Sequence, residues 1–308
     1  MKNMFQPVNL AIDKDNKFYI TDFGDNTVKI FSNLNDLTTP TSVITGFNFN
    51  EKTFSFPDIL ITLKEVSVEG GVAETHNDKL FISDPFNHVV KVYDIDNTLE
   101  LIATLGSFGS GDTQFNQPSG MALNADGTEL HVVDMMNHRI SVWSTSTFDH
   151  IKNYGSLGHG ENSGLYYPID ILHIGSGVML VADCGHNRVV KFNANGSEST
   201  PYVVKKLDEY VKHEYDASGI LSLTTRTFPL ISLETDGTNF YISDLYTSNI
   251  VKFNSSWVEA STPVAVYGSE VGNVKFPKGM LVLVDEDKMY VADTMSGEIE
   301  EFALVKNF

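Results

Sequence analysis

The chain has 308 residues, 42% hydrophobic and 11% aromatic, enough for one large domain or two ordinary ones. Its 21 Lys and Arg stand against 40 Asp and Glu, a formal net charge of −19. Nucleic acids and anionic membranes attract cationic surfaces, so this charge argues against both as partners. A protein that binds RNA would need a basic face, and the excess of Asp and Glu disfavours one.

Cysteine and hydropathy add two exclusions. Cys184 is the single cysteine, so no disulfide forms within the chain. Residues 1–7 contain no apolar stretch of signal-peptide length, and no run of 18 apolar residues occurs. We therefore expect neither a Sec-type signal nor a membrane span, and a protein that is cytoplasmic or part of a virus-like assembly.

A strand-like run that ends in aspartate recurs six times. The aspartates are Asp22, Asp84, Asp134, Asp183, Asp244 and Asp293. An aromatic residue follows nine positions later in every case: Phe31, Tyr93, Trp143, Phe192, Phe253 and Phe302. A β-branched residue stands six positions after each aspartate, which is typical of a buried strand. The spacing predicts one supersecondary unit for each repeat.

A proline opens each repeat: Pro7, Pro57, Pro118, Pro168, Pro229 and Pro277. In the first repeat we expect strands over 8–13, 18–22 and 27–31, and a fourth strand precedes the next proline, as at 101–105. The expected units are 5–54, 55–114, 115–165, 166–226, 227–274 and 275–308. Insertions fall at 64–76, between the first and second strands of repeat two, and at 201–227, around the outer strand of repeat four.

Repeats three and four resemble NHL repeats. The resemblance rests on the turns Asp134-Met-Met-Asn-His-Arg-Ile140 and Asp183-Cys-Gly-His-Asn-Arg-Val189, and on the link at 105–122. It implies an all-β, six-bladed NHL-type propeller in a single domain, residues 1–308. Such propellers serve as interaction modules, including on larger assemblies such as phage particles.

The last repeat is short. Only 15 residues (294–308) follow Asp293, too few for a third and a fourth strand of the usual spacing. The sixth blade is therefore expected to lack its own outer strand, with Glu298, Glu300 and Glu301 on the exposed edge. These charges deter unwanted pairing; alternatively, a partner adds a strand there.

Residues that resemble catalytic groups have structural explanations. Each repeat aspartate stands at the start of a tight turn. Its carboxylate can accept hydrogen bonds from the backbone amides of that turn. His88, His138 and His186 occupy corresponding turns of successive blades, which lie on a wide circle and not at metal-ligand distance. Cys184 fills a turn position, so we do not expect it to act as a nucleophile with His186.

The inner strands hold the remaining candidates. Asn9, Asp58 and Asp170 lie within two residues of the prolines, where they could hold a ligand or a Ca²⁺ ion at the mouth of a central channel. His173 and Glu234 occupy equivalent positions in adjacent blades and are expected to form a buried pair.

Two functions remain open. The leading interpretation is a non-enzymatic scaffold, without a cofactor, that presents its loops to a protein or glycan partner. The alternative is a hydrolase or lyase that uses a divalent ion at the channel mouth, as similar propeller lactonases and amidating lyases use calcium or zinc. The metal-ligand histidines of those families are not reproduced in this sequence.

Overall fold

The computed structural model describes residues 4–13, 15–33, 37–46, 59–62, 79–95, 99–158, 164–193, 202–206, 210–215, 221–226, 230–244, 248–268 and 272–304. Over these ranges the chain is almost entirely antiparallel β-structure. Three short 3-10 turns are the helical elements within them: η1 (Met135–Asn137), η2 (Cys184–His186) and η3 (Val284–Glu286). No helix within these ranges is long and apolar enough to cross a membrane.

Four sheets of four strands follow the first four repeats, and their strands are paired in chain order. Sheet 1 contains β1 (Pro7–Ile12), β2 (Phe18–Asp22), β3 (Thr27–Phe31) and β4 (Ser42–Ile44). Sheet 2 contains β5 (Ile59–Thr62), β6 (Lys79–Asp84), β7 (Val89–Asp94) and β8 (Glu100–Leu105). Sheet 3 contains β9 (Pro118–Leu123), β10 (Glu129–Asp134), β11 (Arg139–Ser144) and β12 (His150–Tyr154). Sheet 4 contains β13 (Pro168–His173), β14 (Val178–Asp183), β15 (Arg188–Asn193) and β16 (Tyr202–Lys206).

The last two repeats form three-stranded sheets. Sheet 5 contains β19 (Leu230–Thr235), β20 (Phe240–Asp244) and β21 (Asn249–Phe253), and sheet 6 contains β22 (Pro277–Leu283), β23 (Lys288–Asp293) and β24 (Glu298–Ala303). An irregular outer segment still pairs with β21, because the amide of Ile250 donates to the carbonyl of Ala265 at 3.0 Å. Sheet 6 has no fourth strand among the residues that the structure describes.

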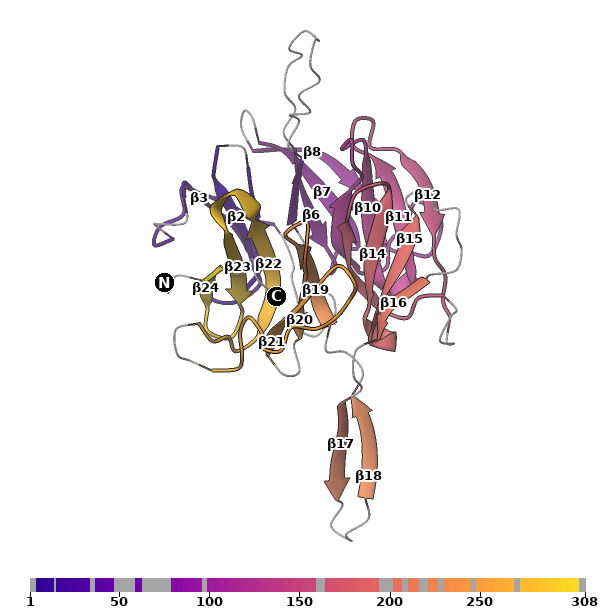
Figure 1. Ribbon diagram of the computed structural model, residues 1–308. Coiled ribbons are helices and arrows are strands. Elements are labelled where there is room, and N and C mark those ends of the chain that lie inside the picture. The colour runs from indigo at the N-terminus through magenta and orange to yellow at the C-terminus, as the bar shows by residue number, and fades with distance from the viewer. Residues whose placement is uncertain are drawn as a thin grey trace.

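The second insertion contains a separate hairpin. Strands β17 (Tyr210–Tyr215) and β18 (Leu221–Arg226) pair with each other as a two-stranded sheet. Figure 1 shows this hairpin extending away from the main body. The first insertion, residues 64–76, lies outside the described ranges.

The six sheets are arranged around a common centre (Figure 1), and their first strands contact one another in chain order. β1 contacts β5, β5 contacts β9, β9 contacts β13, β13 contacts β19, and β19 contacts β22. β22 in turn contacts β1, so the series of contacts returns to its start.

The core consists of six hydrophobic clusters, each between two successive sheets. The aromatic residue of each repeat lies in one cluster and packs against the preceding sheet. Trp143 of sheet 3, for example, shares a cluster with Phe81 and Val92 of sheet 2. Phe31 of sheet 1 packs with Tyr290 and Ala292 of sheet 6. The regular aromatic spacing therefore reflects a regular contact between neighbouring sheets.

The connections define two faces. The chain alternates direction from strand to strand, so the turns between second and third strands lie at the same end as the links between sheets. We call this end the link face. The opposite end, the turn face, carries the turns between first and second and between third and fourth strands.

Candidate functional site

The repeat aspartates join turns to links on the link face. The Asp134 carboxylate accepts the amide of Asn116 at 2.7 Å, the side-chain amide of Asn137 at 2.7 Å and Nε of Arg139 at 2.8 Å. Asp183 likewise accepts the amide of Tyr166 and Nε of Arg188, both at 2.7 Å. Both aspartates are fully buried. Their carboxylates thus have the structural partners expected for turn residues.

Two repeat histidines tie one sheet to the next. Nδ1 of His88 accepts the amide of Gln117 at 3.0 Å, and Nδ1 of His138 accepts the amide of Tyr167 at 3.0 Å. In each pair the histidine lies in one sheet's turn, and the amide lies just before the proline of the next sheet. The third histidine, His186, instead contacts the Asp183 carboxylate at 2.8 Å. These roles follow from the turn itself, and Asn87 and Asn137 bind the repeat aspartate beside them.

Cys184 is buried between sheets 4 and 5. Burial, and then the charges of Asp183 and Asp244, raise the pKa of its thiol far above the usual range. The thiol therefore stays protonated at neutral pH and is not an activated nucleophile.

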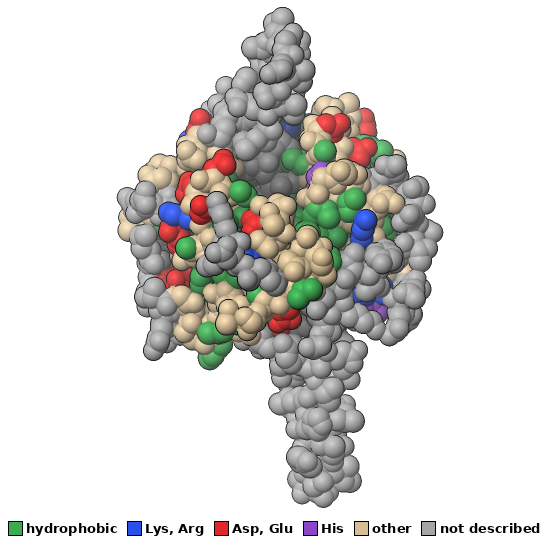
Figure 2. All heavy atoms as spheres, viewed as in Figure 1, with side chains coloured by type: hydrophobic (Ala, Val, Ile, Leu, Met, Phe, Trp, Pro, Cys, Tyr) green, Lys and Arg blue, Asp and Glu red, His purple; other side chains and the backbone are tan. Residues whose placement is uncertain are grey.

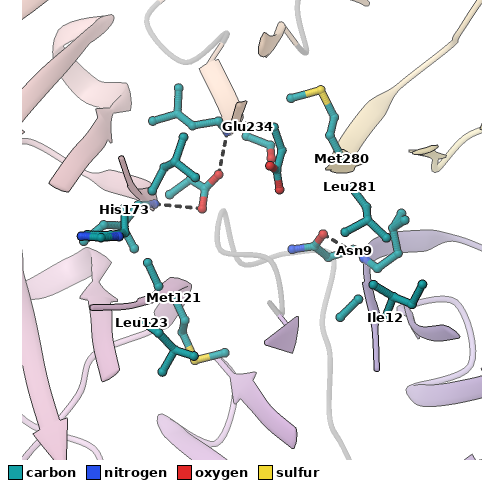
Figure 3. Close-up of a pocket in the computed structure, with 16 residues that line it drawn as sticks. Asn9, Ile12, Met121, Leu123, His173, Glu234, Met280 and Leu281 are labelled. Carbon is teal, nitrogen blue, oxygen red and sulfur yellow. Dashed lines mark hydrogen bonds between the residues drawn. The ribbon is translucent and has the colours of Figure 1, made fainter. Parts of the chain in front are cut away.

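A cavity of about 300 Å³ lies at the centre, lined by the first strands of sheets 1, 3, 4, 5 and 6 (Figure 3). Four of the predicted site residues, Asn9, Asp170, His173 and Glu234, line it together. Asp58, the remaining candidate of the inner strands, lies outside the described residues. The remaining wall is mainly apolar, with Met121, Leu123, Met280 and Leu281 among its side chains. Figure 2 shows hydrophobic side chains beside a hollow in the middle of the visible face.

Both carboxylate oxygens of Asp170 accept hydrogen bonds from backbone amides. Oδ1 accepts the amide of Ile171 at 2.9 Å, and Oδ2 accepts the amide of Leu233 in sheet 5 at 2.7 Å. Burial raises the pKa of Asp170 to about 6, although the two amides pull it downward. A β-bulge between Pro168 and Asp170 places the side chain there. Asp170 thus connects sheets 4 and 5 at the cavity wall.

Asn9 occupies the equivalent position in sheet 1. A bulge also separates it from Pro7, and its Oδ1 accepts the amide of Leu10 at 2.8 Å. The adjacent sheet supplies a glycine beside each of these polar residues. A Cβ on Gly279 would collide with Oδ1 of Asn9, and a Cβ on Gly120 would collide with Oδ1 of Asp170. The two glycines therefore permit close approach between neighbouring first strands.

His173 and Glu234 lie on this cavity wall in adjacent sheets. Nε2 of His173 is buried without a hydrogen-bond partner, and burial lowers the pKa of its ring. One Glu234 oxygen accepts the amide of Thr235 at 3.3 Å. Within the described residues no group of three or more His, Cys, Asp or Glu side chains has a geometry that could hold a metal ion.

Sequence reasoning missed a buried polar contact of sheet 3. His131 on β10 is fully buried, and its Nδ1 lies 2.9 Å from the hydroxyl of Tyr154. Burial is the main cause that lowers the pKa of His131 to about 4; the charges of Lys152 and His173 act in the same direction. The signal was a single histidine within the apolar strand 130–133.

The three predicted edge glutamates lie on β24, at the edge of sheet 6. Glu301 is exposed and forms an ion pair with Lys288 at 3.2 Å, while Glu298 and Glu300 are half-buried. In sheets 1 to 4 the third strand instead carries a cation that binds the repeat aspartate: Lys29, Lys91, Arg139 and Arg188, at 2.5 to 3.0 Å.

Large exposed hydrophobic residues are more frequent on the link face than on the turn face, among the residues that the structure describes. Six of them lie in its links and turns: Phe5, Phe86, Phe108, Leu157, Tyr267 and Met295, with 44% to 70% of their surfaces exposed. Only two of those described on the turn face are comparable, Val258 and Val284 at 55% and 50%. The remaining ones lie on or beside outer strands. The link face is therefore the more apolar of the two.

Part of the chain is similar in sequence to known repeat proteins. A stretch of 79 residues is 33% identical to NHL repeat-containing protein 2 of Homo sapiens, and 77 residues are 31% identical to the Bos taurus protein. Each match covers 22% of this chain and 10% of the relative, so the chain matches about a tenth of the length of these curated relatives. These matches support NHL-type repeats in the chain, and the similar solved structures support a propeller-like fold. No family model matches.

Solved structures with low sequence identity share the fold of this chain. A protein of unknown function from Bacteroides thetaiotaomicron superposes with a TM-score of 0.64 at 16% identity, covering 98% of this chain and 70% of that one. A catalytically inactive virginiamycin B lyase from Staphylococcus aureus, solved with quinupristin, gives a TM-score of 0.52 at 12% identity and covers 100% and 87%. At identities this low the similarity is evidence for a shared fold and carries no information about lyase activity in this chain.

Proposed function

We propose that the six sheets are the blades of a closed six-bladed NHL propeller, a non-enzymatic scaffold whose link face binds a protein partner. The exposed apolar residues of that face carry the proposal. Phenylalanine, tyrosine and methionine side chains are enriched at protein-binding surfaces. Closure is supported by the contacts of β22 with β1 and by the cluster that joins sheets 6 and 1.

The arrangement of charged groups favours binding over catalysis. The repeat aspartates and two of the repeat histidines accept hydrogen bonds that hold turns and links in place. At the cavity, Asp170 and Asn9 accept backbone amides. These side chains have structural partners, whereas the apolar residues of the link face project into solvent.

Photocrosslinking in the producing cell tests the proposal. Benzoylphenylalanine replaces Phe108 or Tyr267 on the link face, or Val258 or Val284 on the turn face as matched controls. We expect one and the same protein to be crosslinked from both link-face positions and from neither control. The crosslink at position 108 should disappear when Tyr267→Ser is introduced.

Two results would overturn this proposal. Equal crosslinking from both faces would show nonspecific contact. Absence of a protein adduct, combined with binding to a glycan array that Phe108→Ser and Tyr267→Ser abolish, would assign the face to a glycan.

A further inference from the structure

Strand β24 differs from the third strands of the other sheets in the pairing of its outer side. In sheets 1 to 4 the third strand pairs with a fourth strand on its outer side. In sheet 5 the outer segment supplies the same bonds: Ile250 donates to Ala265, and its carbonyl accepts the amide of Val264 at 2.7 Å. β24 pairs with β23 on its inner side, and no described segment pairs with its outer side.

The repeat register identifies the backbone groups on this outer side. Ile250 stands six residues after Asp244, and Ile299 stands six residues after Asp293. In sheets 1 and 5 the carbonyl eight residues after the aspartate also faces outward, accepting from the outer segment at Ile30 and Lys252. By the same register, the amide and carbonyl of Ile299 and the carbonyl of Glu301 face the open edge. These groups form a template for one more antiparallel strand.

The charge of this edge selects the occupant. The two third-strand positions that hold cations in sheets 1 to 4, five and seven residues after the aspartate, hold Glu298 and Glu300 in sheet 6. Burial raises the pKa of Glu300, and the charges of Glu298 and Asp293 raise it further. A strand with Lys or Arg at its centre would supply positive charge beside these carboxylates.

A second copy of this chain fits poorly. Two β24 strands would bring the same glutamates together, and each chain has a net charge of −19. The register of two other sheets shows where a cation on an added strand would lie. In β12 Lys152 lies opposite Val142, eight residues after Asp134, and in β16 Lys206 lies opposite Arg188, five residues after Asp183. The corresponding positions of sheet 6 hold Glu301 and Glu298.

We propose that β24 is a docking edge for an extended, lysine- or arginine-bearing segment of a partner protein, which pairs antiparallel to it as the fourth strand of sheet 6. The inference rests on the proposed binding function and names a second surface for it. The bound segment would hydrogen-bond Ile299 and Glu301 through its backbone, and its cations would lie near Glu298 and Glu300.

Binding of a labelled peptide to the purified full chain tests this edge. The probe copies residues 201–208, which include the strand β16 and both of its lysines. Fluorescence anisotropy compares it with two matched peptides, one with both lysines replaced by glutamate and one with N-methyl groups on alternate backbone amides. We expect each change to weaken binding at least tenfold, because the first reverses the charge and the second blocks the strand ladder.

Variants of the chain separate the edge from general attraction to an acidic protein. Glu300→Lys should weaken binding of the lysine peptide at least tenfold. Glu100→Lys, which changes the charge equally on an exposed residue of β8, should leave binding within twofold of the original. Hydrogen exchange of the Ile299 amide should slow at least tenfold when the peptide saturates the chain.

Three outcomes would overturn the proposal. Equal binding of the lysine and N-methylated peptides would show charge attraction without pairing, and equal effects of Glu100→Lys and Glu300→Lys would show the same. If the Ile299 amide is protected in the free chain and exposed after removal of residues 1–3 or 305–308, the chain's own terminus fills the edge. None of these results changes the crosslinks expected at Phe108 and Tyr267, so the two proposals fail separately.

Discussion

The two faces of the molecule are held by different kinds of contact. On the turn face, Asp126 accepts the amide and hydroxyl of Thr128, two residues away, and Asp236 accepts groups from residues 238, 239 and 241. On the link face, His88 and His138 each bind an amide 29 residues away. These turn-face contacts join residues of a single turn, whereas the two histidine contacts of the link face form only when neighbouring sheets are in place. Mutations on the two faces should differ accordingly in cost.

Loss of a repeat aspartate should have the largest effect. Asp183→Ala removes the acceptor of the Tyr166 amide and leaves the buried Arg188 guanidinium without its carboxylate. Removing one partner of a buried ion pair costs about 3–5 kcal/mol, so we expect a loss of that size in the free energy of unfolding. Asp126→Ala on the turn face should cost no more than about 1 kcal/mol. Urea denaturation measures both, and similar losses would remove the distinction between the faces.

A matched pair of glycines gives the next effect. Gly106 in a link and Gly127 in a turn both have positive φ, at +80° and +70°. An added Cβ at Gly106 would collide with the Phe115 ring, whereas at Gly127 it meets nothing within 4 Å. We expect Gly127→Ala to cost about 1 kcal/mol from backbone strain alone, and Gly106→Ala about 3 kcal/mol or more. Thermal unfolding distinguishes them, and equal midpoints would contradict the close packing of the link.

The histidine ties should have an intermediate effect. His138→Ala leaves the partly buried Tyr167 amide without its acceptor; because an unsatisfied buried donor costs about 1–3 kcal/mol, we expect a loss near the lower end of that range. Hydrogen exchange should accelerate at the Tyr167 amide and leave the turn-face amide of Thr128 unchanged. Unchanged exchange at both sites would show that the tie contributes nothing in solution.

The smallest expected effect near neutral pH comes from His131 and Asp170, whose pKa values shift in opposite directions. The folded state lowers the pKa of His131 to about 4, so the unfolded chain binds more protons and stability falls as pH drops below about 6.5. The folded state raises the pKa of Asp170 to about 6, so its contribution has the opposite sign, and stability from this group rises as pH drops below about 6. Tyr154, Glu129, Lys152 and His173 surround or influence His131.

Variants resolve the two contributions. Between pH 7 and about pH 5.5, His131→Gln should remove roughly 1 kcal/mol of acid destabilisation, and Asp170→Asn should remove a stabilisation of similar size. Urea denaturation at several pH values measures both. Changes of the same sign in the two variants would contradict the assigned shifts.

Much of the fold could be predicted from the spacing of the repeated residues in the sequence. The aspartate that ends each second strand and the aromatic nine residues later depend on local pattern, and the structure has strands ending at Asp22, Asp134 and Asp293 as expected. The outer segment of sheet 5 is irregular, because Pro263 interrupts it without an amide to donate. That irregularity could be anticipated from the sequence.

The candidate site was less accessible to sequence reasoning. Asn9 and Asp170 were expected near the channel, but their acceptor roles depend on bulges and on glycines in other sheets. The amide that Asp170 binds lies 63 residues away in sheet 5. The position of His131 against Tyr154 depends on the register between β10, β11 and β12. These contacts are set by how sheets meet, which no local pattern contains.

The meeting of sheets 6 and 1 has a mechanical consequence. Among the described strands none is shared between them; they are joined by side-chain packing and by contacts such as the hydroxyl of Thr294 donating to the carbonyl of Pro7 at 2.6 Å. A force that pulls Pro7 of sheet 1 away from Thr294 of sheet 6 would act directly across this seam. Packed side chains separate in succession, unlike a strand ladder that resists shear along its length. Under tension this molecule should therefore open first at the seam, with the other five junctions still intact.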